Sequence, residues 1–553
     1  MISGIGDNLA AATIGQVSAA PAQTAAVRDT APALPTDSLV RAQSSDDGLM
    51  SPSMVKAHSS STSEVAATEV VAEAEEVGAK SANSYLDKWG PQVIYFPLTD
   101  RFNDGDPSNN MGVDKADPRG YHGGDLQGII DKLDYLDDLG VTTLWLAPLY
   151  DNVDRAGDGV HDWGSGYHGY WIQDHYKVEE HQGDMSKVKE LVDKAHDKGM
   201  KIVLDTVLNH TAPGHQWTQD PSKHDWFHHN GGIQNWENPW ELANRDVCGL
   251  PDLNQSNPDT YKFLLDNTLW WIKETGADGI RLDAVKHIDH EFWQKFSADI
   301  KAEMGDDFMV LGEVLHGDPN VQAGYQRDGL SSLFDMPLYY TMKETFAQDG
   351  SCRKLAARFG EDCKYDQPGQ MVTLLDNHDF ERFLESAKGY RSHDKLMLGM
   401  DMIMTCRGIP SIYYGTETGL EGANDPYNRG DMNFGENGHI TDHLKKLTSI
   451  RAGLPALQTG SQMEMWVDDQ IYGFCRRQDG QEVISIVNND YSGQTRDIPL
   501  REGSPIKEGE TLVDALTGEK FQVRNGKVNV YIPDKKGRIL VPEKFMGDIK
   551  FKN

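Results

Sequence analysis

The sequence predicts an α/β fold: a (β/α)₈ TIM barrel with an inserted loop domain after its third strand, followed by a C-terminal antiparallel β-sandwich. Three observations favour this fold. From residue 92 onward, apolar strand-like runs alternate with amphipathic helical stretches. Several of these runs end in a carboxylate, and barrel enzymes collect their active-site residues at the C-terminal ends of the strands. After residue 457 the helical periodicity stops, and short strand-like runs separated by turns follow.

Eight apolar runs are the expected barrel strands. They are residues 93–98, 143–147, 201–205, 279–283, 309–313, 333–336, 371–375 and 410–414. Between them, residues 126–139, 188–198 and 261–274 carry apolar side chains at helical spacing. Strands that alternate with helices in this way are typical of a parallel sheet closed into a barrel. We therefore expect the barrel to occupy residues 85–457.

The longest departure from this alternation is residues 211–258, which are rich in Trp, His, Asn and Pro and show little periodicity. A loop of that length is usually functional. Residues 458–553 are expected to form an all-β domain, with strands at 471–476, 483–488, 511–515, 528–532 and 538–541. Residues 1–84 are rich in Ala, Ser, Thr and Pro and have almost no aromatic side chains, so we expect them to be disordered.

The totals argue against several partners. The formal net charge is −33, from 53 Lys and Arg against 86 Asp and Glu. Nucleic acid and anionic membranes bind basic surfaces, so no nucleic acid and no membrane is expected as a partner. A monomer is expected. No apolar run approaches the roughly 20 residues of a membrane-spanning helix. The N-terminal region lacks the basic start and apolar core of an ordinary secretory signal, which leaves localisation open.

The cysteines are scattered and lack the spacing of metal ligands. They are Cys248, Cys352, Cys363, Cys406 and Cys475. Ordinary thiols are expected, and a Cys352–Cys363 bridge is the alternative.

Three acidic residues stand at or just past the ends of expected strands: Asp283, Glu313 and Asp379. A single Asp at a strand end is more often a capping or ion-pairing residue, but a barrel gathers its strand ends and would bring these three together. Arg281 lies two residues before Asp283 and so on the same side of the strand, where its charge keeps the Asp ionised. An ionised Asp beside a Glu that holds a proton is the pair that retaining glycosidases use.

Five ordered segments carry a more specific signal. They are 205–210 (DTVLNH), 250–254 (LPDLN), 279–287 (GIRLDAVKH), 311–314 (LGEV) and 374–379 (LLDNHD). Together they resemble the signature regions of the α-amylase family of glycoside hydrolases, and the resemblance extends over residues 85–553. It implies hydrolysis of α-1,4-glucosidic bonds in starch, glycogen or malto-oligosaccharides with retained configuration. By this likeness Asp283 is the nucleophile, Glu313 the general acid/base and Asp379 the residue that stabilises the transition state.

The resemblance also implies a set of substrate-binding residues. They are His168, Tyr170, Trp171, His210, Arg281, Lys286, His287, His378, Asp425 and Arg429. Residues 166–171 (GYHGYW) resemble the segment whose Tyr, here Tyr170, stacks on the apolar face of a sugar ring. An isolated Tyr-Trp pair would otherwise be expected to pack in the core. Asp425 and Arg429 resemble a more distant glucose-binding pair.

Two calcium sites are implied in the same way. Asn209, Asp252 and the backbone carbonyl of His287 match the family's calcium site, and Ca²⁺ prefers several oxygen ligands of these kinds. A second cluster resembles an additional calcium site of some relatives, including cyclodextrin glycosyltransferases. Its ligands would be Asp104, Asp106, Asn109, Asn110, Asp125 and the carbonyl oxygen of Gly123. The alternative for this second cluster is a turn rich in Asp and Asn that binds no ion.

The reaction within the family is a separate question, because its members include hydrolases, transglycosylases and isomerases. Cyclising relatives carry an aromatic residue at the position of Cys248 and bulky aromatics after the acid/base, where this chain has Val314, Leu315 and His316. Hydrolysis is therefore favoured, with a 4-α-glucanotransferase as the alternative. Two non-enzyme alternatives are a transport subunit that lost the acids and a carbohydrate-binding protein that acts through the C-terminal domain.

Overall fold

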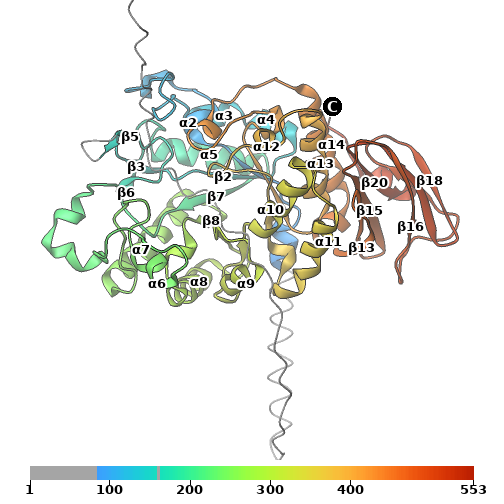
Figure 1. Cartoon of the computed structure of the whole chain (residues 1–553). Coiled ribbons are helices and arrows are strands. Elements are labelled where there is room, and N and C mark those ends of the chain that lie inside the picture. Colours follow the sequence, from blue (N-terminus) through green and yellow to red (C-terminus); the bar gives the residue numbers. More distant parts are fainter. Residues whose placement is uncertain (1–83, 158–161, 553) are drawn as a thin grey trace, which may run out of the picture. The chain divides into compact units, whose positions relative to one another are not determined.

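Eight parallel strands form a barrel in the computed structural model, which describes residues 84–157 and 162–552. Figure 1 shows the whole chain, with the C-terminal domain in red. The expected disordered region lies outside the described residues, apart from Ser84. The strand order is β10-β9-β8-β7-β2-β1-β12-β11. The strands are β1 (Ile94–Phe96), β2 (Thr143–Leu146), β7 (Lys201–Thr206), β8 (Gly279–Leu282), β9 (Met309–Gly312), β10 (Ser332–Leu333), β11 (Val372–Thr373) and β12 (Ile409–Tyr413). A parallel bridge between Phe334 and Val372 joins the two ends of the sheet. The expected barrel is thus confirmed.

Helices follow the barrel strands along the chain, and one short helix, Pro239–Asn244, belongs to the excursion after the third strand. They are α2 (Thr99–Phe102), α3 (Leu126–Asp131), α4 (Leu133–Leu139), α5 (Met185–Asp197), α6 (Pro239–Asn244), α7 (Pro258–Thr275), α8 (His290–Met304), α9 (Pro319–Arg327), α10 (Met336–Met342), α11 (Arg353–Gly360), α12 (Phe383–Ser386), α13 (Ser392–Thr405), α14 (Gly438–Gly453) and α15 (Pro455–Thr459). In α5 the Asp184 side chain caps the first turn, and the buried residues recur every three or four positions, which turns one face inward. The expected helix 126–139 is two helices that meet at Lys132.

Two excursions leave the barrel after β2 and after β7. Their elements are β3 (Tyr150–Asn152), β4 (Ala156–Gly157), β5 (Asp162–Gly164) and β6 (Ile172–Val178) in the first, and the 3₁₀ helices η2 (Gln216–Gln219) and η3 (Pro221–Trp226) with α6 in the second. Isolated bridges pair His210 with Asp252 and Phe227 with Leu253, so the start and end of the second excursion lie together. Both follow C-terminal strand ends, the face on which barrel active sites form.

The C-terminal domain is an antiparallel sheet in the order β13-β14-β15-β20-β17-β18-β19-β16. Its strands are β13 (Ser461–Val467), β14 (Ile471–Gln478), β15 (Gln481–Asn488), β16 (Gln494–Pro499), β17 (Thr511–Asp514), β18 (Lys520–Arg524), β19 (Lys527–Ile532) and β20 (Lys536–Pro542). Apolar residues from both halves of the sheet share one core, among them Ile484 and Val530, so the sheet folds onto itself as a sandwich. Strands β13, β16 and β18 were not expected; each has only one buried residue, so they lack the continuous apolar run of a core strand.

The cysteines are free thiols, with Cys352 buried and Cys363 exposed. The alternative of a Cys352–Cys363 bridge is therefore wrong. Within residues 84–157 and 162–552, no helix combines the length and apolar character needed to cross a membrane.

Candidate active site

Arg281 is the centre of a buried group of three carboxylates. Its side chain is fully buried on β8. Nη1 donates to Asp283 Oδ1 at 2.7 Å and to Asp205 Oδ1 at 2.9 Å, and Nη2 pairs with Glu313 Oε1 at 2.8 Å. Asp205 is part of β7, and Asp283 and Glu313 directly follow β8 and β9. The three strands are neighbours in the barrel. One guanidinium group therefore holds the expected nucleophile and the expected acid/base beside each other.

Glu313 is suited to carry a proton at neutral pH. Burial raises the pKa of Glu313 to about 8; Arg281 opposes this shift, and the negative charges of Asp379 and Asp283 add to it. The backbone N–H of Ala284 donates to Glu313 Oε2 at 3.1 Å and fixes the orientation of the carboxyl group. A protonated, oriented carboxyl group is what a general acid requires.

Asp205 is a site residue that the sequence prediction did not include. Burial raises the pKa of Asp205 to about 7, with Arg281 opposing the shift. Its Oδ2 accepts hydrogen bonds from the Tyr170 hydroxyl at 2.8 Å and from Trp145 Nε1 at 3.1 Å. Asp205 thus connects the expected sugar-stacking ring to Arg281. It lies near the end of a strand-like run, so the signal that singled out Asp283 was present here as well.

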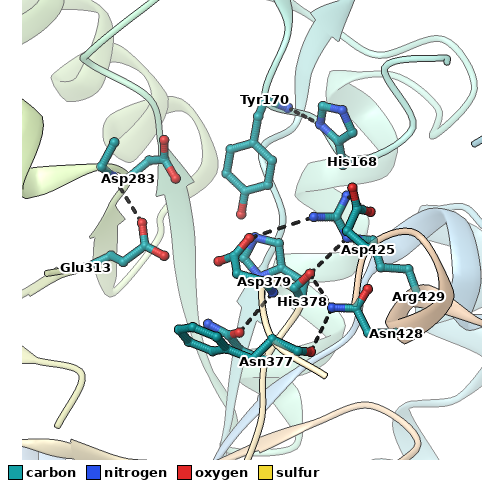
Figure 2. A network of polar contacts seen from close by, with 12 residues as sticks. His168, Tyr170, Asp283, Glu313, Asn377, His378, Asp379, Asp425, Asn428 and Arg429 are labelled. Carbon is teal, nitrogen blue, oxygen red and sulfur yellow. Dashed lines mark hydrogen bonds and ion pairs between the residues drawn. The ribbon is translucent and has the colours of Figure 1, made fainter. Parts of the chain in front are cut away.

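Asp379 lies across from Asp283 and Glu313, in a loop after β11 (Figure 2). Its Oδ1 is 3.4 Å from His378 Nε2 and 3.7 Å from Arg429 Nη2. Burial raises the pKa of Asp379, and Arg429 is the main opposing charge. The structure therefore brings the three expected catalytic acids together.

The loop that carries Asp379 is fastened through its backbone. The carbonyl oxygen of His378 accepts hydrogen bonds from Asn428 Nδ2 at 2.7 Å and from Arg429 Nε at 3.0 Å (Figure 2). Arg429 Nη1 pairs with Asp425 at 3.0 Å and donates to the Tyr167 hydroxyl at 3.2 Å. Asn428 and Tyr167 were not among the predicted site residues. Tyr167 lies in the quoted segment 166–171, but its support of Arg429 depends on a contact between distant parts of the chain.

Aromatic rings line the space between these groups. The rings of Tyr170 and His378 stack with centroids 5.3 Å apart and an interplanar angle of 5°. His168 accepts the backbone N–H of Tyr170 through Nδ1 at 3.0 Å, and its ring packs edge-on against Trp171. Burial holds the pKa values of His168 and His378 well below their usual range. Both imidazoles are therefore neutral and offer a donor or an acceptor to a hydroxyl group.

The remaining expected contacts divide between the site and the second excursion. His210 Nε2 donates to the Tyr170 carbonyl oxygen at 3.1 Å. Lys286 Nζ donates to the carbonyl oxygen of Leu315 at 3.1 Å, next to the acid/base segment. His287 Nδ1 bonds the carbonyl oxygen of Leu242 in α6 at 3.1 Å, and burial lowers the pKa of His287 to about 3. The His287 ring thus contacts the excursion through one of its nitrogens.

The first expected calcium site contains buried oxygens that lack a partner. Asn209 Oδ1 and Asp252 Oδ1 are both buried, and neither has a hydrogen-bond partner within the described residues. The other oxygen of Asp252 lies 2.6 Å from His228 Nδ1, and burial raises the pKa of Asp252 to about 7. Buried oxygens without donors are costly, and a cation would supply the missing partner. These residues fit a hard cation.

The second expected calcium site shows the same feature. Asn109 Oδ1 and Asn110 Oδ1 are buried without a partner in the described part of the chain. A Cβ placed on Gly123 would lie 2.6 Å from Asn110 Oδ1 and 3.2 Å from Asp104 Oδ2, so these oxygens gather at a glycine. Asp125 also has a structural role, because its Oδ1 accepts the N–H of Gly128 and caps α3. This set fits a cation as well.

Comparisons with known proteins agree with this geometry. The family model described as the alpha amylase catalytic domain matches residues 96–481. A beta/alpha-amylase of Paenibacillus polymyxa is 40% identical, over 82% of this chain but only 38% of that relative's length. A cyclomaltodextrin glucanotransferase of Klebsiella oxytoca is 34% identical, over 74% of this chain and 72% of its own. The solved structure of an Anoxybacillus alpha-amylase has a TM-score of 0.77 and 39% identity, and the match covers 82% of this chain and 99% of that chain.

Proposed function

The chain belongs to the α-amylase family of glycoside hydrolases, and we propose that it cleaves α-1,4-glucosidic bonds of starch, glycogen or malto-oligosaccharides with retention of configuration. The observation that carries this proposal is the buried Arg281 guanidinium, which donates a hydrogen bond to Asp283 at 2.7 Å and forms an ion pair with Glu313 at 2.8 Å. A carboxylate held by a positive charge beside a carboxyl group that keeps its proton is what a double displacement requires.

In the first step Glu313 gives its proton to the glycosidic oxygen while Asp283 attacks the anomeric carbon. The bond between that carbon and the oxygen breaks, the leaving sugar departs with the proton, and a covalent glycosyl-enzyme remains. Asp379 and Arg281 stabilise the charges that develop at the sugar and at the carboxylates.

In the second step Glu313 acts as a base. Once Asp283 has become a neutral ester, its negative charge no longer raises the pKa of Glu313, so Glu313 holds its proton less tightly. It takes a proton from a water molecule as the water oxygen attacks the anomeric carbon from the face that the leaving sugar vacated. The ester bond between that carbon and Asp283 breaks, which frees the sugar and returns Asp283 to its carboxylate form. Two inversions give net retention.

The surrounding residues bind the sugar on either side of the cleaved bond. Tyr170 stacks on the ring next to the cleavage point, and its hydroxyl is held by Asp205. Trp171 packs edge-on against His168 beside it. His168, His210 and His378 bond sugar hydroxyls as neutral imidazoles. On the leaving-group side we assign Lys286 and His287, and on the distant side Asp425 and Arg429.

Calcium is the proposed cofactor. Asn209, Asp252 and the His287 carbonyl would hold one ion, and the cluster around Gly123 a second. A bound ion would tie the second excursion to the barrel. Chelation is therefore expected to lower the melting temperature of the whole chain, measured by calorimetry before and after excess EDTA. An unchanged melting temperature would remove both assignments.

The reaction is tested by the configuration of the first product. We expect proton NMR during hydrolysis of maltopentaose to show the α-anomer of the new reducing end before mutarotation. If the β-anomer appears first, the double displacement is wrong.

Transfer to a sugar acceptor is the second candidate, because the Klebsiella relative is a glucanotransferase. Cys248, exposed and at a positive φ of 52°, offers no ring around which a glucan chain could wind, which favours hydrolysis. Incubation with maltotriose separates the two reactions. Hydrolysis yields only shorter sugars, whereas transfer also yields longer ones.

A further inference from the structure

Tyr390 and Tyr491 form an exposed aromatic pair away from the catalytic acids. Tyr390 is 76% exposed and Tyr491 is 43% exposed. Their rings stack with centroids 5.7 Å apart and an interplanar angle of 28°. Among the large hydrophobic residues that are exposed in the described part of the chain, these are the two whose rings pack on each other. Tyr390 comes from the barrel and Tyr491 from the C-terminal domain.

Tyr491 is held in place from behind by charged groups. Its hydroxyl donates to Asp349 Oδ2 at 2.9 Å, and Lys535 Nζ lies 4.3 Å from its ring centroid. Lys535 Nζ also pairs with Asp349 at 2.6 Å, and Lys395 pairs with the same carboxylate at 2.7 Å. Lys535 is fully buried, so it presses against the inner side of the ring system. These contacts fix the Tyr491 ring, which serves as a rigid platform for the Tyr390 ring stacked on it.

Tyr390 rests on this platform in a loop that is itself anchored. The next residue, Arg391, has a φ of 61° and donates to Asp394 Oδ2 at 2.6 Å and to the carbonyl oxygen of Asp534 at 3.1 Å. Because the Tyr390 side chain is mostly exposed, its packing contributes little to folding stability. The anchoring therefore presents the ring to solvent and does not bury it.

The loop lies on the same face of the barrel as the catalytic acids. It connects α12 to the start of α13, and this connection follows Asp379 after the C-terminal end of β11. In a parallel barrel these connections all lie at the active-site face. Tyr390 is thus on that face of the barrel, where its ring contacts Tyr491 of the C-terminal domain.

We propose that the Tyr390–Tyr491 pair is a second carbohydrate-binding site, which takes pyranose rings of an α-glucan chain outside the catalytic cleft. The inference rests on the proposed function. The apolar face of a glucose ring stacks on the open face of an aromatic side chain, and tyrosine loses little conformational entropy when it binds. A site on the same face as the catalytic acids would hold a long glucan near them. It would not change the hydrolysis of short oligosaccharides, which cannot reach both sites.

Electrophoresis of the full chain through native gels that contain soluble starch tests this site. All variants carry Asp283→Asn, so that the gel is not digested. We expect Tyr390→Ala to weaken retention by about fivefold relative to the parent, in keeping with the loss of one aromatic contact. Tyr390→Trp should restore it. The matched control is Tyr531→Ala, which removes a 49% exposed tyrosine of the same domain as Tyr491. Melting curves verify that each variant is folded.

Equal retention of Tyr390→Ala and the parent, or equal loss in the Tyr531→Ala control, would overturn the second site, as would a parent that is not retained. Failure of the proposed function looks different: the chain with Asp283 intact would release no sugar from maltotriose. The gel therefore tests the second binding site, and the sugar assay separately tests the proposed activity.

Discussion

The two flanks of the active site are built in different ways. On one flank Asp205, Asp283 and Glu313 come from three adjacent strands and share one buried cation, Arg281. On the other flank Asp379 stands in a loop whose backbone is held by side chains from a second loop. The first flank is organised by charge and strand register, and the second by hydrogen bonds to the backbone carbonyl oxygens of His378 and Phe380.

This difference indicates how the two flanks divide their tasks. Strand ends in a barrel have fixed spacing, so they can hold two carboxyl groups at the separation that proton transfer and nucleophilic attack require. A loop can change its sequence without disturbing the barrel, so it is the better place for contacts that select the substrate. We expect substitutions on the strand flank, and of Asp379 itself, to act on kcat, whereas substitutions of the other loop-flank residues should act mainly on KM.

The sharpest test removes the nucleophile from the strand flank. Asp283→Asn should lower kcat on soluble starch by about 10⁴-fold or more, because no covalent intermediate can form. Reducing-sugar release measures this loss. The control is Asp442→Asn, an exposed acid on α14, which should keep normal activity. Activity of Asp283→Asn close to that of the unmodified chain would mean that this flank is not catalytic.

The second test removes the shared cation. Arg281→Met should lower kcat by about 10²-fold or more, because three buried carboxyl groups lose their common partner. Arg281 lowers the pKa of Glu313, so the alkaline limb of the pH profile should also move to higher pH. Arg281→Lys keeps the charge and should leave that limb near its original position. An alkaline limb that stays in place in Arg281→Met would show that Arg281 does not lower the pKa of Glu313.

The third test uses pH alone. The pKa of Glu313 is raised to about 8, and the general acid works only in its protonated form. Below about pH 8 this form predominates, and kcat/KM should fall about tenfold for each further pH unit above it. Initial rates on maltopentaose from neutral to alkaline pH measure the limb. A decline that is complete before neutral pH would contradict the assignment of Glu313.

The smallest expected effect is on the loop flank. Asp425→Asn weakens the 3.0 Å pair with Arg429 and removes a charge that is partly exposed. We expect KM for maltopentaose to rise about fivefold, equivalent to about 1 kcal/mol, with kcat little changed. A large loss of kcat with unchanged KM would erase the distinction between the two flanks.

More residues of the strand flank than of the loop flank could be predicted from the sequence. The eight strands were predictable because buried parallel strands are near-continuous apolar runs, and the acids at their ends stand out against that background. Only two residues of β10 form a strand, because α10 begins at Met336, where the apolar run 333–336 still continues. An apolar run does not reveal where a strand gives way to a helix.

The supports of the site were harder to predict for a physical reason. Asp205 shared the strand-end signal, but its bond to Tyr170 depends on how the excursion after β2 folds back. Asn428 acts through its amide on a backbone carbonyl, which any sequence can provide. Such contacts arise from the relative placement of distant segments, and local composition carries no record of them.

The junction between β10 and β11 has a consequence for how the protein moves. These two-residue strands meet through a single bridge, between Phe334 and Val372, and they separate Glu313 from Asp379 around the barrel. A seam with so few backbone hydrogen bonds should exchange its amide protons for deuterium sooner than β7, β8 and β9 do. The distance between Glu313 and Asp379 would then be the one that varies most within the catalytic centre. A sugar bound to both residues would hold them at a fixed separation.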